Sequence, residues 1–439
     1  MKAGCCGVVG PGPSAALDKT AGHDVRAGAA LLAAGRTNLR GTGGDGRVKH
    51  TPARARNLCR TDTLTGVVTP TLYPMLDLQS EVRELWPELQ PAVERVLRSG
   101  YFIGGPEVER FEAAAAEYLG VEHAVGLNSG TDALILGLDA LGVGPGDEVV
   151  TTAFSFFATS EAVLRLGATP VFVDIDPVSL NLRSDLVEAA ITDRTKALLP
   201  VHVFGLPAPI EELRSLAARR GVHLLEDCAQ SFGSVSGGQH LGSFGAVGAF
   251  SFYPTKNLGA YGDAGMLTTN DPQLAARVRS LRNHGSSPSN KYLHDGLGHN
   301  SRLDALQAAV LNVKLGHVAD FNERRRERAG AYRQALSALP QGPGALQMPP
   351  DDARHVYHQF TIQVPADRRP ALEAELSKRG VAFSRFYPTP LTHQPAGSDF
   401  GRAPEAELAC QRVLSLPIHP WLPDAAIDAV AQALKAALA

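Results

Sequence analysis

The sequence predicts an α/β protein, with a large domain built on a mostly parallel β-sheet and a small C-terminal α+β domain. Three observations predict this class. From about residue 73, short apolar runs typical of buried strands alternate with helical segments of ten or more residues, the pattern of a sheet covered by helices on both faces. The chain has 439 residues, 44% of them hydrophobic, which suffices for a large core. A Pro- and Gly-rich break at residues 340–344 lies close to the predicted boundary between domains 71–335 and 336–439.

Each element of the large domain follows from the local pattern of apolar residues. An amphipathic pattern predicts a first helix, and the Gly-Gly-Pro turn at 104–106 separates it from a second. In chain order, helices are expected over residues 81–98, 108–119, 131–141, 157–166, 184–191 and 210–220, and a long helical region with a polar face over 302–336. The short apolar runs predict strands over residues 124–127, 148–151, 170–174, 196–201, 223–226, 248–252 and 265–269.

The same rules predict the elements of the small domain. Strands are expected over residues 359–364 and 381–385, and helices over 369–379 and 424–438. No internal repeat is visible in the chain.

Residues 1–70 are expected to form a disordered or spurious leader. They contain no Phe, Trp or Tyr, and they carry ten Lys and Arg residues against four Asp and no Glu. Such a segment cannot bury enough apolar surface to offset the entropy of ordering its backbone. We therefore expect that translation begins near Met75 and that this segment is not part of the fold.

Composition also excludes several classes of protein. No run of 18 or more uninterrupted apolar residues occurs, so a membrane-spanning helix is not expected. The five scattered cysteines fit neither a disulfide framework nor a zinc site. The net charge of -3 gives no signal for binding nucleic acid. We expect a cytoplasmic protein without a metal, nucleic-acid or membrane partner.

Two segments at predicted strand ends carry the first chemical signals. Ser129, Gly130 and Thr131 lie between a strand and a helix, where free amides, the helix dipole and two hydroxyls can bind a phosphate. A simple helix cap is the other interpretation. Glu226 and Asp227 end a buried strand, at the edge where parallel sheets bind ligands. Metal ligands or a satisfied loop pair are the other interpretations.

Two further segments follow along the chain. Lys256 comes after an apolar strand, and Phe252, Tyr253 and Leu258 flank it. Such surroundings lower the pKa of an ammonium group and make the amine a nucleophile, although most lysines are solvated surface charges. The segment GHNSRLD at residues 298–304 opens a predicted helix, and its polar side chains could serve only as a cap.

Together these segments supply what pyridoxal 5′-phosphate requires. They offer a phosphate cradle at residues 129–131, a carboxylate at Asp227 for the pyridine nitrogen and an amine at Lys256 for a Schiff base. With Asp227 paired to it, the ring nitrogen stays protonated and the ring accepts electrons from a breaking Cα–H bond. Lys256, once displaced by the substrate amine, would carry the proton between carbons. Phe156 is the candidate for stacking on the ring, with core packing as the alternative interpretation.

These residues, in this order, resemble the DegT/DnrJ/StrS-type family of nucleotide-sugar aminotransferases, which are fold-type I pyridoxal phosphate enzymes. The similarity runs from about Leu76 to the C-terminus. Its landmarks are residues 77–79 (DLQ), 102–106 (FIGGP), 129–131 (SGT), 171–174 (VFVD), 200–205 (PVHVFG), 226–227 (ED), 251–256 (SFYPTK), 300–303 (NSRL), 387–390 (YPTP) and 416–420 (LPIHP). The resemblance implies a large domain with a seven-stranded type of sheet and a small C-terminal domain.

The resemblance also implies roles for residues around the coenzyme. Lys256 would form the Schiff base, Asp227 would pair with the pyridinium, and Gln230 would lie beside the phenolic oxygen and the substrate. The turn at Ser129, Gly130 and Thr131 would hold the phosphate together with Ser251, and Phe156 would cover the ring.

A second set of roles concerns the substrate and a partner subunit. Asn300 would reach the phosphate bound by the other subunit, so each active site would lie across a homodimer interface. Tyr387 would contact the substrate. An amino acid, typically glutamate in this family, would load the coenzyme with an amine, which then passes to a keto carbon of a nucleotide-linked sugar in polysaccharide or amino-sugar biosynthesis.

The resemblance favours one sugar, a UDP-linked 3-keto-N-acetylhexosaminuronate. Residues 156–162, 283–285 and 300–302 are similar to members acting on it, in which an Arg matching Arg302 lies near the sugar carboxylate. A planar guanidinium suits bidentate pairing with a carboxylate. Several such enzymes have His where this chain has Phe386, and an apolar residue there is common in enzymes of 4-keto-6-deoxy nucleotide sugars, which stay the alternative.

Two alternative functions differ from this one in what they require of the site residues. A related branch of the family dehydrates sugars, but its members typically have His in place of the Schiff-base lysine, so Lys256 argues against that branch. A pyridoxal phosphate-binding regulatory protein without turnover is the alternative from a different class. The presence of Lys256, Asp227 and Gln230 together favours an enzyme.

Overall fold

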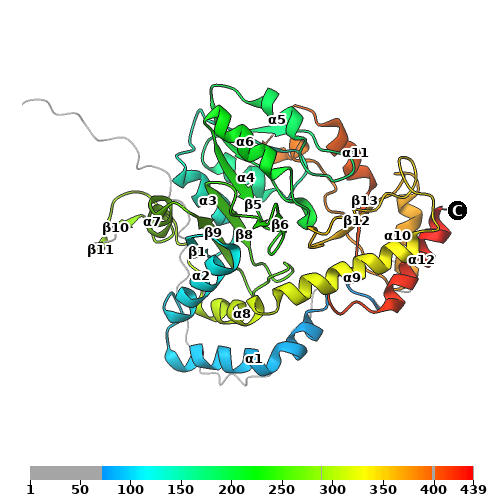
Figure 1. Cartoon of the computed structure of the whole chain (residues 1–439), viewed down its shortest axis with the longest axis horizontal. Coiled ribbons are helices and arrows are strands. Elements are labelled where there is room, and N and C mark those ends of the chain that lie inside the picture. Colours follow the sequence, from blue (N-terminus) through cyan, green and yellow to red (C-terminus); the bar gives the residue numbers. More distant parts are fainter. Residues whose placement is uncertain (1–71, 288, 398–400, 439) are drawn as a thin grey trace, which may run out of the picture. The chain divides into compact units, whose positions relative to one another are not determined.

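A seven-stranded sheet forms the centre of the chain in this computed structural model (Figure 1). Its strands are β1 (His123–Leu127), β2 (Glu148–Thr152), β3 (Thr169–Val173), β4 (Thr195–Leu199), β5 (His223–Asp227), β8 (Val247–Ser251) and β9 (Gly265–Thr269). They lie in the order β1-β9-β8-β5-β4-β2-β3, and only β9 runs antiparallel to its neighbours. The predicted mostly parallel α/β sheet is therefore confirmed. The structure describes residues 72–438 except 288 and 398–400, so the predictions for residues 1–70 lie outside it.

Helices cover both faces of this sheet. One face packs against α3 (Gly130–Ala140), α4 (Ala158–Arg165) and α7 (Pro272–Leu281). The other packs against α2 (Pro106–Leu119), α5 (Ser184–Ala190), α6 (Ile210–Arg220) and α8 (Ala305–Leu315), and α1 (Leu78–Ser99) packs on α8. Adjacent strand residues point to opposite faces, so Leu224 joins the cluster under α6 while Leu225 joins the cluster under α3. Burial on both sides explains why these strands are continuously apolar.

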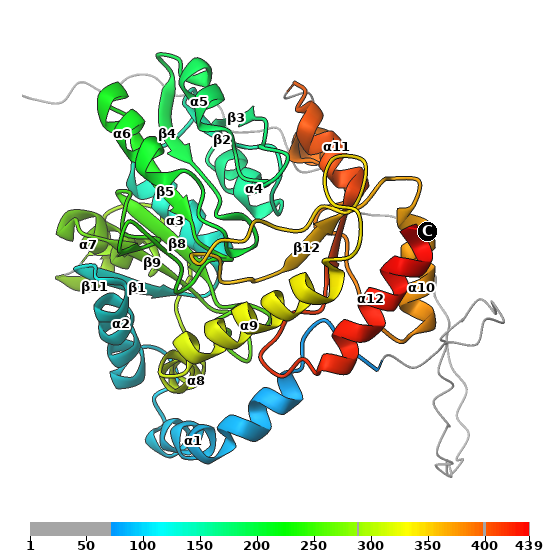
Figure 2. The ribbon, with the colours of Figure 1, turned by 45° about the vertical axis from the view of Figure 1, so that its right-hand side comes forward.

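Several C-terminal elements lie side by side next to the long helix α9 (Val318–Leu336) (Figure 2), and their apolar side chains form a separate cluster. They are β12 (Phe360–Gln363), β13 (Val413–Leu416), α10 (Arg369–Lys378) and α12 (Asp424–Leu438), and β12 pairs antiparallel with β13. Helix α11 (Pro404–Arg412) packs instead in a different apolar cluster, with Phe154 and Ile175. Helix α9 leads into the C-terminal elements: its first residue, Val318, packs in the cluster under the sheet and its last, Leu336, in the C-terminal cluster. Because α9 belongs to both clusters, the predicted boundary between domains at residue 336 stays a prediction.

Short elements complete the described chain. They are the strand pairs β6 (Val235–Ser236) with β7 (Gln239–His240) and β10 (Ser286–Ser287) with β11 (Asn290–His294), and the 3-10 turns η1 (Val203–Gly205), η2 (Leu391–His393) and η3 (Pro395–Gly397).

Several elements differ from the prediction. The helical region 302–336 is two helices, α8 and α9, because the chain turns at Gly316 and His317. The strand predicted at 381–385 is wrong: this segment makes only isolated bridges, and β12 pairs instead with β13. Helices α7 and α11 and strand β13 were not predicted, although Asp271 caps α7 and a proline opens each helix.

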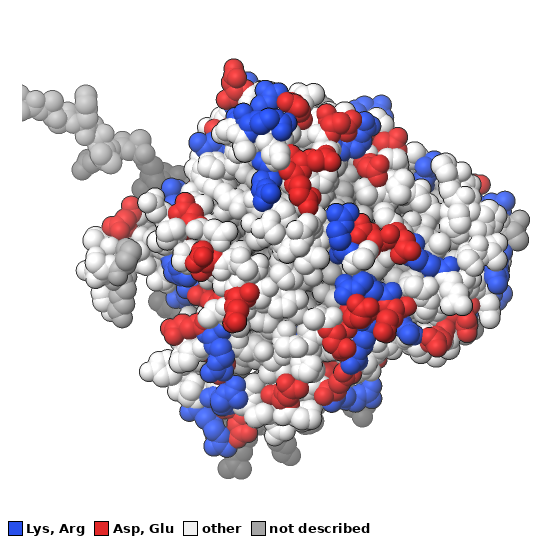
Figure 3. Space-filling model, in the orientation of Figure 1, with Lys and Arg blue, Asp and Glu red and all other residues white. Residues whose placement is uncertain are grey.

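Two features of the described surface complete the fold. On the face shown in Figure 3, basic and acidic side chains are interspersed, in keeping with the small net charge of -3. Within residues 72–438, as far as they are described, no helix is long and apolar enough to cross a membrane.

Candidate active site

A cavity of about 590 Å³ lies where β5 and β8 end and where the chain leaves β1 and β2. Ligands bind at this edge in open α/β sheets, since the carboxyl ends of the strands meet there. The predicted site residues that line the cavity are Ser129, Gly130, Thr131, Phe156, Asp227, Gln230, Ser251, Lys256 and Tyr387. Asn300 and Arg302 do not line it.

The turn between β1 and α3 forms one end of the cavity. Ser129 is the N-cap of α3, and its hydroxyl accepts a hydrogen bond from the Asp132 amide at 3.1 Å. The first amides of a helix have no carbonyl partner within it and favour an anion. At Gly130, a Cβ atom would lie 2.5 Å from the Cβ of Ser251, so the turn touches the end of β8. The N-cap and the phosphate cradle are therefore compatible interpretations of the same turn.

Asp227 supplies the carboxylate of the cavity wall. Only 4% of its surface is exposed, and burial raises the pKa of its carboxyl group above the ordinary value. Two donors oppose that shift: the Ala229 amide donates to Oδ1 at 3.1 Å, and the Thr159 hydroxyl donates to Oδ2 at 2.9 Å. A carboxylate has about four acceptor positions, so acceptor capacity remains for the N–H of a ligand.

Lys256 lies in the connection between β8 and β9, on the wall of the same cavity. Burial lowers the pKa of its ammonium group from 10.5 to about 8, although the charge of Asp227 opposes this shift. Among the described residues, no side chain or carbonyl is hydrogen-bonded or ion-paired to its Nζ atom. The amine is therefore free to react and is partly neutral close to physiological pH.

Gln230 and Tyr387 form a polar and aromatic wall. The Gln230 side chain accepts a hydrogen bond from the Phe204 amide at 2.8 Å and donates one to the Tyr387 hydroxyl at 2.9 Å. The Tyr387 ring stacks on Phe204, with centroids 6.3 Å apart. Phe156 is 60% exposed, whereas Phe154, two residues earlier, is fully buried. Core packing therefore does not explain Phe156, and its ring is available to a ligand.

Sequence reasoning missed other residues that line this cavity. Ser155 and Thr159 are two hydroxyls next to predicted residues, and Asp263 is an exposed acid on the connection after Lys256. His358 comes from the segment before β12, and its buried Nδ1 atom has no hydrogen-bond partner in the described part of the chain. Burial and the nearby Lys256 hold the His358 pKa well below its ordinary value. Residues 156–162 carry part of the family resemblance, but no spacing rule identifies which hydroxyl of this segment reaches Asp227.

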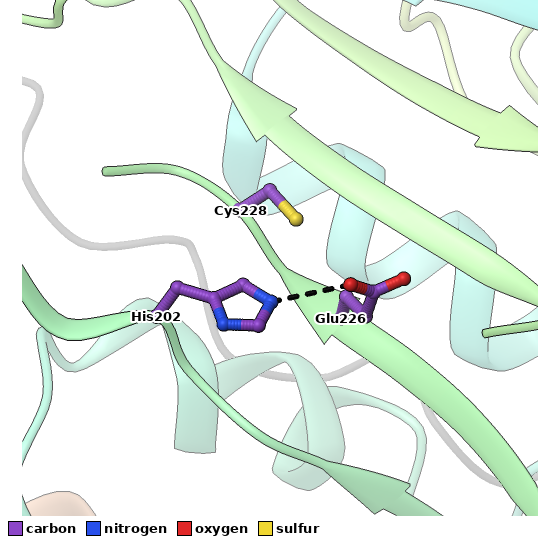
Figure 4. A group of neighbouring side chains, drawn as sticks. All are labelled: His202, Glu226 and Cys228. Atoms are coloured by element: carbon purple, nitrogen blue, oxygen red, sulfur yellow. Dashed lines mark hydrogen bonds and ion pairs between the residues drawn. The ribbon is translucent and has the colours of Figure 1, made fainter. Parts of the chain in front are cut away.

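On the face of β5 opposite to Asp227, His202, Glu226 and Cys228 form a buried cluster (Figure 4). Its possible ligand atoms all lie within 4.8 Å of one another. Glu226 accepts hydrogen bonds from the Gly242, Phe244 and Gly245 amides. His202 Nδ1 accepts from the Ala208 amide at 3.0 Å, so Nε2 carries the proton toward Glu226 at 3.2 Å. These hydrogen bonds satisfy the histidine and the carboxylate, and the cluster is explained as a structural clamp without a metal.

Asn300 and Arg302 lie on the chain that precedes α8. Asn300 is exposed and forms an isolated bridge with Asn283. Arg302 Nη1 donates to the Asn283 side chain at 3.4 Å, while its buried Nε has no hydrogen-bond partner within the described ranges. Among the described residues, no carboxylate is ion-paired with Arg302. Its guanidinium is therefore available for an anion from outside this chain.

Residues 84–435 match the model of the DegT/DnrJ/EryC1/StrS aminotransferase family. The chain belongs to this family. It is 45% identical over 372 residues to the UDP-N-acetyl-3-dehydro-alpha-D-glucosamine 3-aminotransferase of Acidithiobacillus ferrooxidans, with 84% of this chain and 98% of the relative covered. It is 39% identical over 364 residues to the UDP-2-acetamido-2-deoxy-3-oxo-D-glucuronate aminotransferase of Pseudomonas aeruginosa, with 83% and 99% covered.

Solved structures agree with this membership. The crystal structure of S. venezuelae DesV in complex with a ketimine intermediate is 44% identical and superposes with a TM-score of 0.79, covering 84% of this chain and 98% of that chain. The present chain is therefore a pyridoxal 5′-phosphate-dependent sugar aminotransferase that acts on a nucleotide sugar with an amino donor. The predicted family, fold class, enzyme class and cofactor are confirmed.

The chemical groups that line the cavity match those of pyridoxal 5′-phosphate. The cavity combines the amides at the N-terminus of α3, a buried carboxylate with acceptor capacity and an amine that has no partner among the described residues. These are the groups that a phosphate, a pyridine nitrogen and an aldehyde need.

Proposed function

We propose that this enzyme transfers an amino group from glutamate to the C3 keto carbon of a UDP-linked N-acetylhexosaminuronate. The proposal depends mainly on the guanidinium group of Arg302. Its guanidinium has no carboxylate partner among the described side chains, and its buried Nε lacks an acceptor. A sugar carboxylate would supply that acceptor in a bidentate pair. Keto or amino groups at C3 in the names of the two relatives above support the position of transfer.

The chain's own residues would hold the coenzyme at four points. Lys256 would attach it covalently, Asp227 would accept the N–H of its ring, and the turn around Ser129 with Ser251 would bind its phosphate. Phe156, whose ring is exposed in the cavity, would cover the ring face. When bound, pyridoxal phosphate supplies an electron sink that stabilises the carbanion formed at the carbon bearing the amine.

Proton transfer is then the task of Lys256. Once the substrate amine has displaced Lys256 from the coenzyme, its Nζ would be a free amine whose pKa burial lowers to about 8, so it can take a proton from carbon and return one near neutral pH. Gln230 is fixed by hydrogen bonds to Phe204 and Tyr387, so its side chain can orient a neighbouring oxygen of the coenzyme or the sugar. The aromatic wall of Tyr387 and Phe386 would exclude water from the reacting carbon.

We also propose that Asn300 and Arg302 serve the active site of a partner subunit in a cytoplasmic homodimer. Two observations support this arrangement. Both residues lie outside the cavity of their own chain. The neighbouring hairpin and loop carry exposed apolar side chains, Leu293 at 53% and Leu297 at 95%, which a second copy would cover.

A panel of keto sugars tests the proposed substrate. Purified enzyme, glutamate and UDP-linked 3-keto sugars with and without the C6 carboxylate would be compared, with dTDP-linked 4-keto-6-deoxy sugars alongside. We expect turnover to be fastest with the uronate. Arg302→Ala should raise the KM for the uronate about tenfold or more and leave neutral sugars within about twofold. Arg402→Ala, which removes an exposed surface arginine paired with Glu407, is the matched control. Equal losses on both sugar classes would remove the carboxylate role.

A neutral nucleotide-linked keto sugar is the second candidate. Phe386 lines the cavity with an apolar ring, and the relative named for a neutral sugar is 45% identical whereas the one named for the uronate is 39% identical. Faster turnover of a neutral sugar, at C3 or as the 4-keto-6-deoxy form, would favour this candidate.

A further inference from the structure

Two buried hydroxyls form a chain that ends on Asp227. Ser155 Oγ and Thr159 Oγ1 lie 2.9 Å apart, and Thr159 Oγ1 lies 2.9 Å from Asp227 Oδ2. All three side chains are almost completely buried, with exposures of 3% for Ser155, 1% for Thr159 and 4% for Asp227. Since buried hydrogen bonds to charged groups are worth more than exposed ones, this chain acts directly on the carboxylate of the site.

The direction of donation follows from the chemistry of the three groups. An ionised carboxylate only accepts, so the single hydroxyl proton of Thr159 must go to Asp227. The Thr159 oxygen is then left to accept, and Ser155 must donate to it. Each donation polarises the next hydroxyl in the same sense. The chain therefore delivers partial positive charge to Asp227 from the side away from the Ala229 amide.

The fold places these hydroxyls where a packing role alone does not require them. Asp227 has the same parity on β5 as Leu225, so it points to the face covered by α3 and α4. Thr159 is the second residue of α4, and Ser155 lies in the loop that follows β2. Valine has nearly the shape of threonine but no hydroxyl, so a comparison of the two side chains at position 159 isolates what the hydroxyl contributes.

We propose that Ser155 and Thr159 are positioning residues that keep Asp227 ionised and thereby keep the proton on the ring nitrogen of bound pyridoxal phosphate. The proposal rests on the proposed pairing of Asp227 with that nitrogen. Without the donated hydrogen bonds the carboxylate would be more basic, because burial alone disfavours its charge. The shared proton would then move toward Asp227, and the ring would accept electrons less well.

Nitrogen-15 NMR of the holoenzyme tests this directly, because the chemical shift of a ring-labelled coenzyme distinguishes a protonated from a neutral pyridine nitrogen. We expect the wild-type enzyme and Thr159→Ser, which keeps the hydroxyl, to show the protonated state. Thr159→Val should shift the signal toward neutral pyridine and lower kcat about tenfold or more. Ser155→Ala should shift it in the same direction by less. Thr151→Val is the matched control, since Thr151 is equally buried but donates to the Leu199 carbonyl instead.

The outcomes separate this inference from the proposed function. If Asp227→Asn leaves the ring nitrogen protonated, the pairing assigned to Asp227 is wrong and the proposed function of that residue fails. If Asp227→Asn gives neutral pyridine while Thr159→Val keeps the wild-type signal, only the hydroxyl chain is overturned. A shift in Thr159→Val that Thr151→Val reproduces would also overturn it, because any loss of a buried hydroxyl would then suffice.

Discussion

Asp227→Asn should lower the pKa of Lys256 below its present value of about 8. Burial brings this pKa down from 10.5 to about 8, and the Asp227 charge is the interaction that opposes it. Removing an anion removes stabilisation of the ammonium form, so the sign of the change is downward. Asp263→Asn neutralises an exposed acid of the same cavity and should change the Lys256 midpoint little, because solvent screens an exposed charge.

The lowered pKa of Lys256 determines how large a difference in amine reactivity an assay should detect. With a pKa of about 8, roughly one amine in eleven is neutral at pH 7, against roughly one in three thousand at a pKa of 10.5. This is a difference of about 300-fold in reactive amine. The reactivity of Lys256 should therefore rise tenfold per pH unit up to about pH 8 and then level off.

Competitive acetylation of the apoenzyme measures this profile. Peptide mass spectrometry would follow Lys256 between pH 6 and 11, and the exposed Lys378 in the same digest would report the response of the reagent itself. Lys256 reactivity that is still rising at pH 10 would refute the burial argument. A midpoint that moves upward in Asp227→Asn would refute the assigned sign of the interaction between the two residues.

Three further substitutions test a close approach at the cavity, the hydrophobic core and a buried ion pair. Gly130→Ala should weaken coenzyme binding about tenfold in a fluorescence titration, because its Cβ would lie 2.5 Å from that of Ser251; Gly144→Ala, with open space around it, is the control, and equal affinities would contradict the close approach. Phe111→Ala removes a fully buried ring and should cost about 3–5 kcal/mol in urea unfolding, whereas a loss below 1 kcal/mol would mean that the core refills the space. Lys314→Ala removes the ion-pair partner of the buried Glu81 on α1 and should lower the free energy of unfolding by about 3–5 kcal/mol in the same assay. An unchanged urea midpoint would show that the ion pair is not needed for stability.

The central sheet was predictable because its strands are apolar on both faces and its helices are amphipathic. Helix α6 and strand β9 were predicted with the bounds that the structure has, and the other predicted strands of the sheet differ by one or two residues at their ends. In such elements the periodicity of apolar residues predicts the helix or strand conformation well. The pairing partner of a short strand is a different matter: β13 and the segment 381–385 are both short and apolar, and only tertiary contact decides which of them joins β12.

The predicted site residues came from strand ends and the turns after them, and the cavity brings most of them together. Residues that act through another residue were beyond that reasoning. Thr159 donates to Asp227, which lies 68 positions later in the sequence. Nothing in the local sequence distinguishes its hydroxyl from the other hydroxyls of the same segment. His358 lies on the chain that leads to the C-terminal elements, so its place in the cavity depends on how those elements pack against the sheet.

The adjacent acids Glu226 and Asp227 lie on opposite faces of strand β5 and therefore have different hydrogen-bond partners. The pleat of β5 turns Glu226 to the face of Leu224 and Asp227 to the face of Leu225. On its side, Glu226 meets three backbone amides and His202, which consume its acceptor capacity and pin the loop before β8. On the other side, Asp227 meets one amide and one hydroxyl and keeps capacity for a ligand. A one-residue slip of β5 would exchange these environments, so the clamp at Glu226 also fixes the register on which the active-site carboxylate depends.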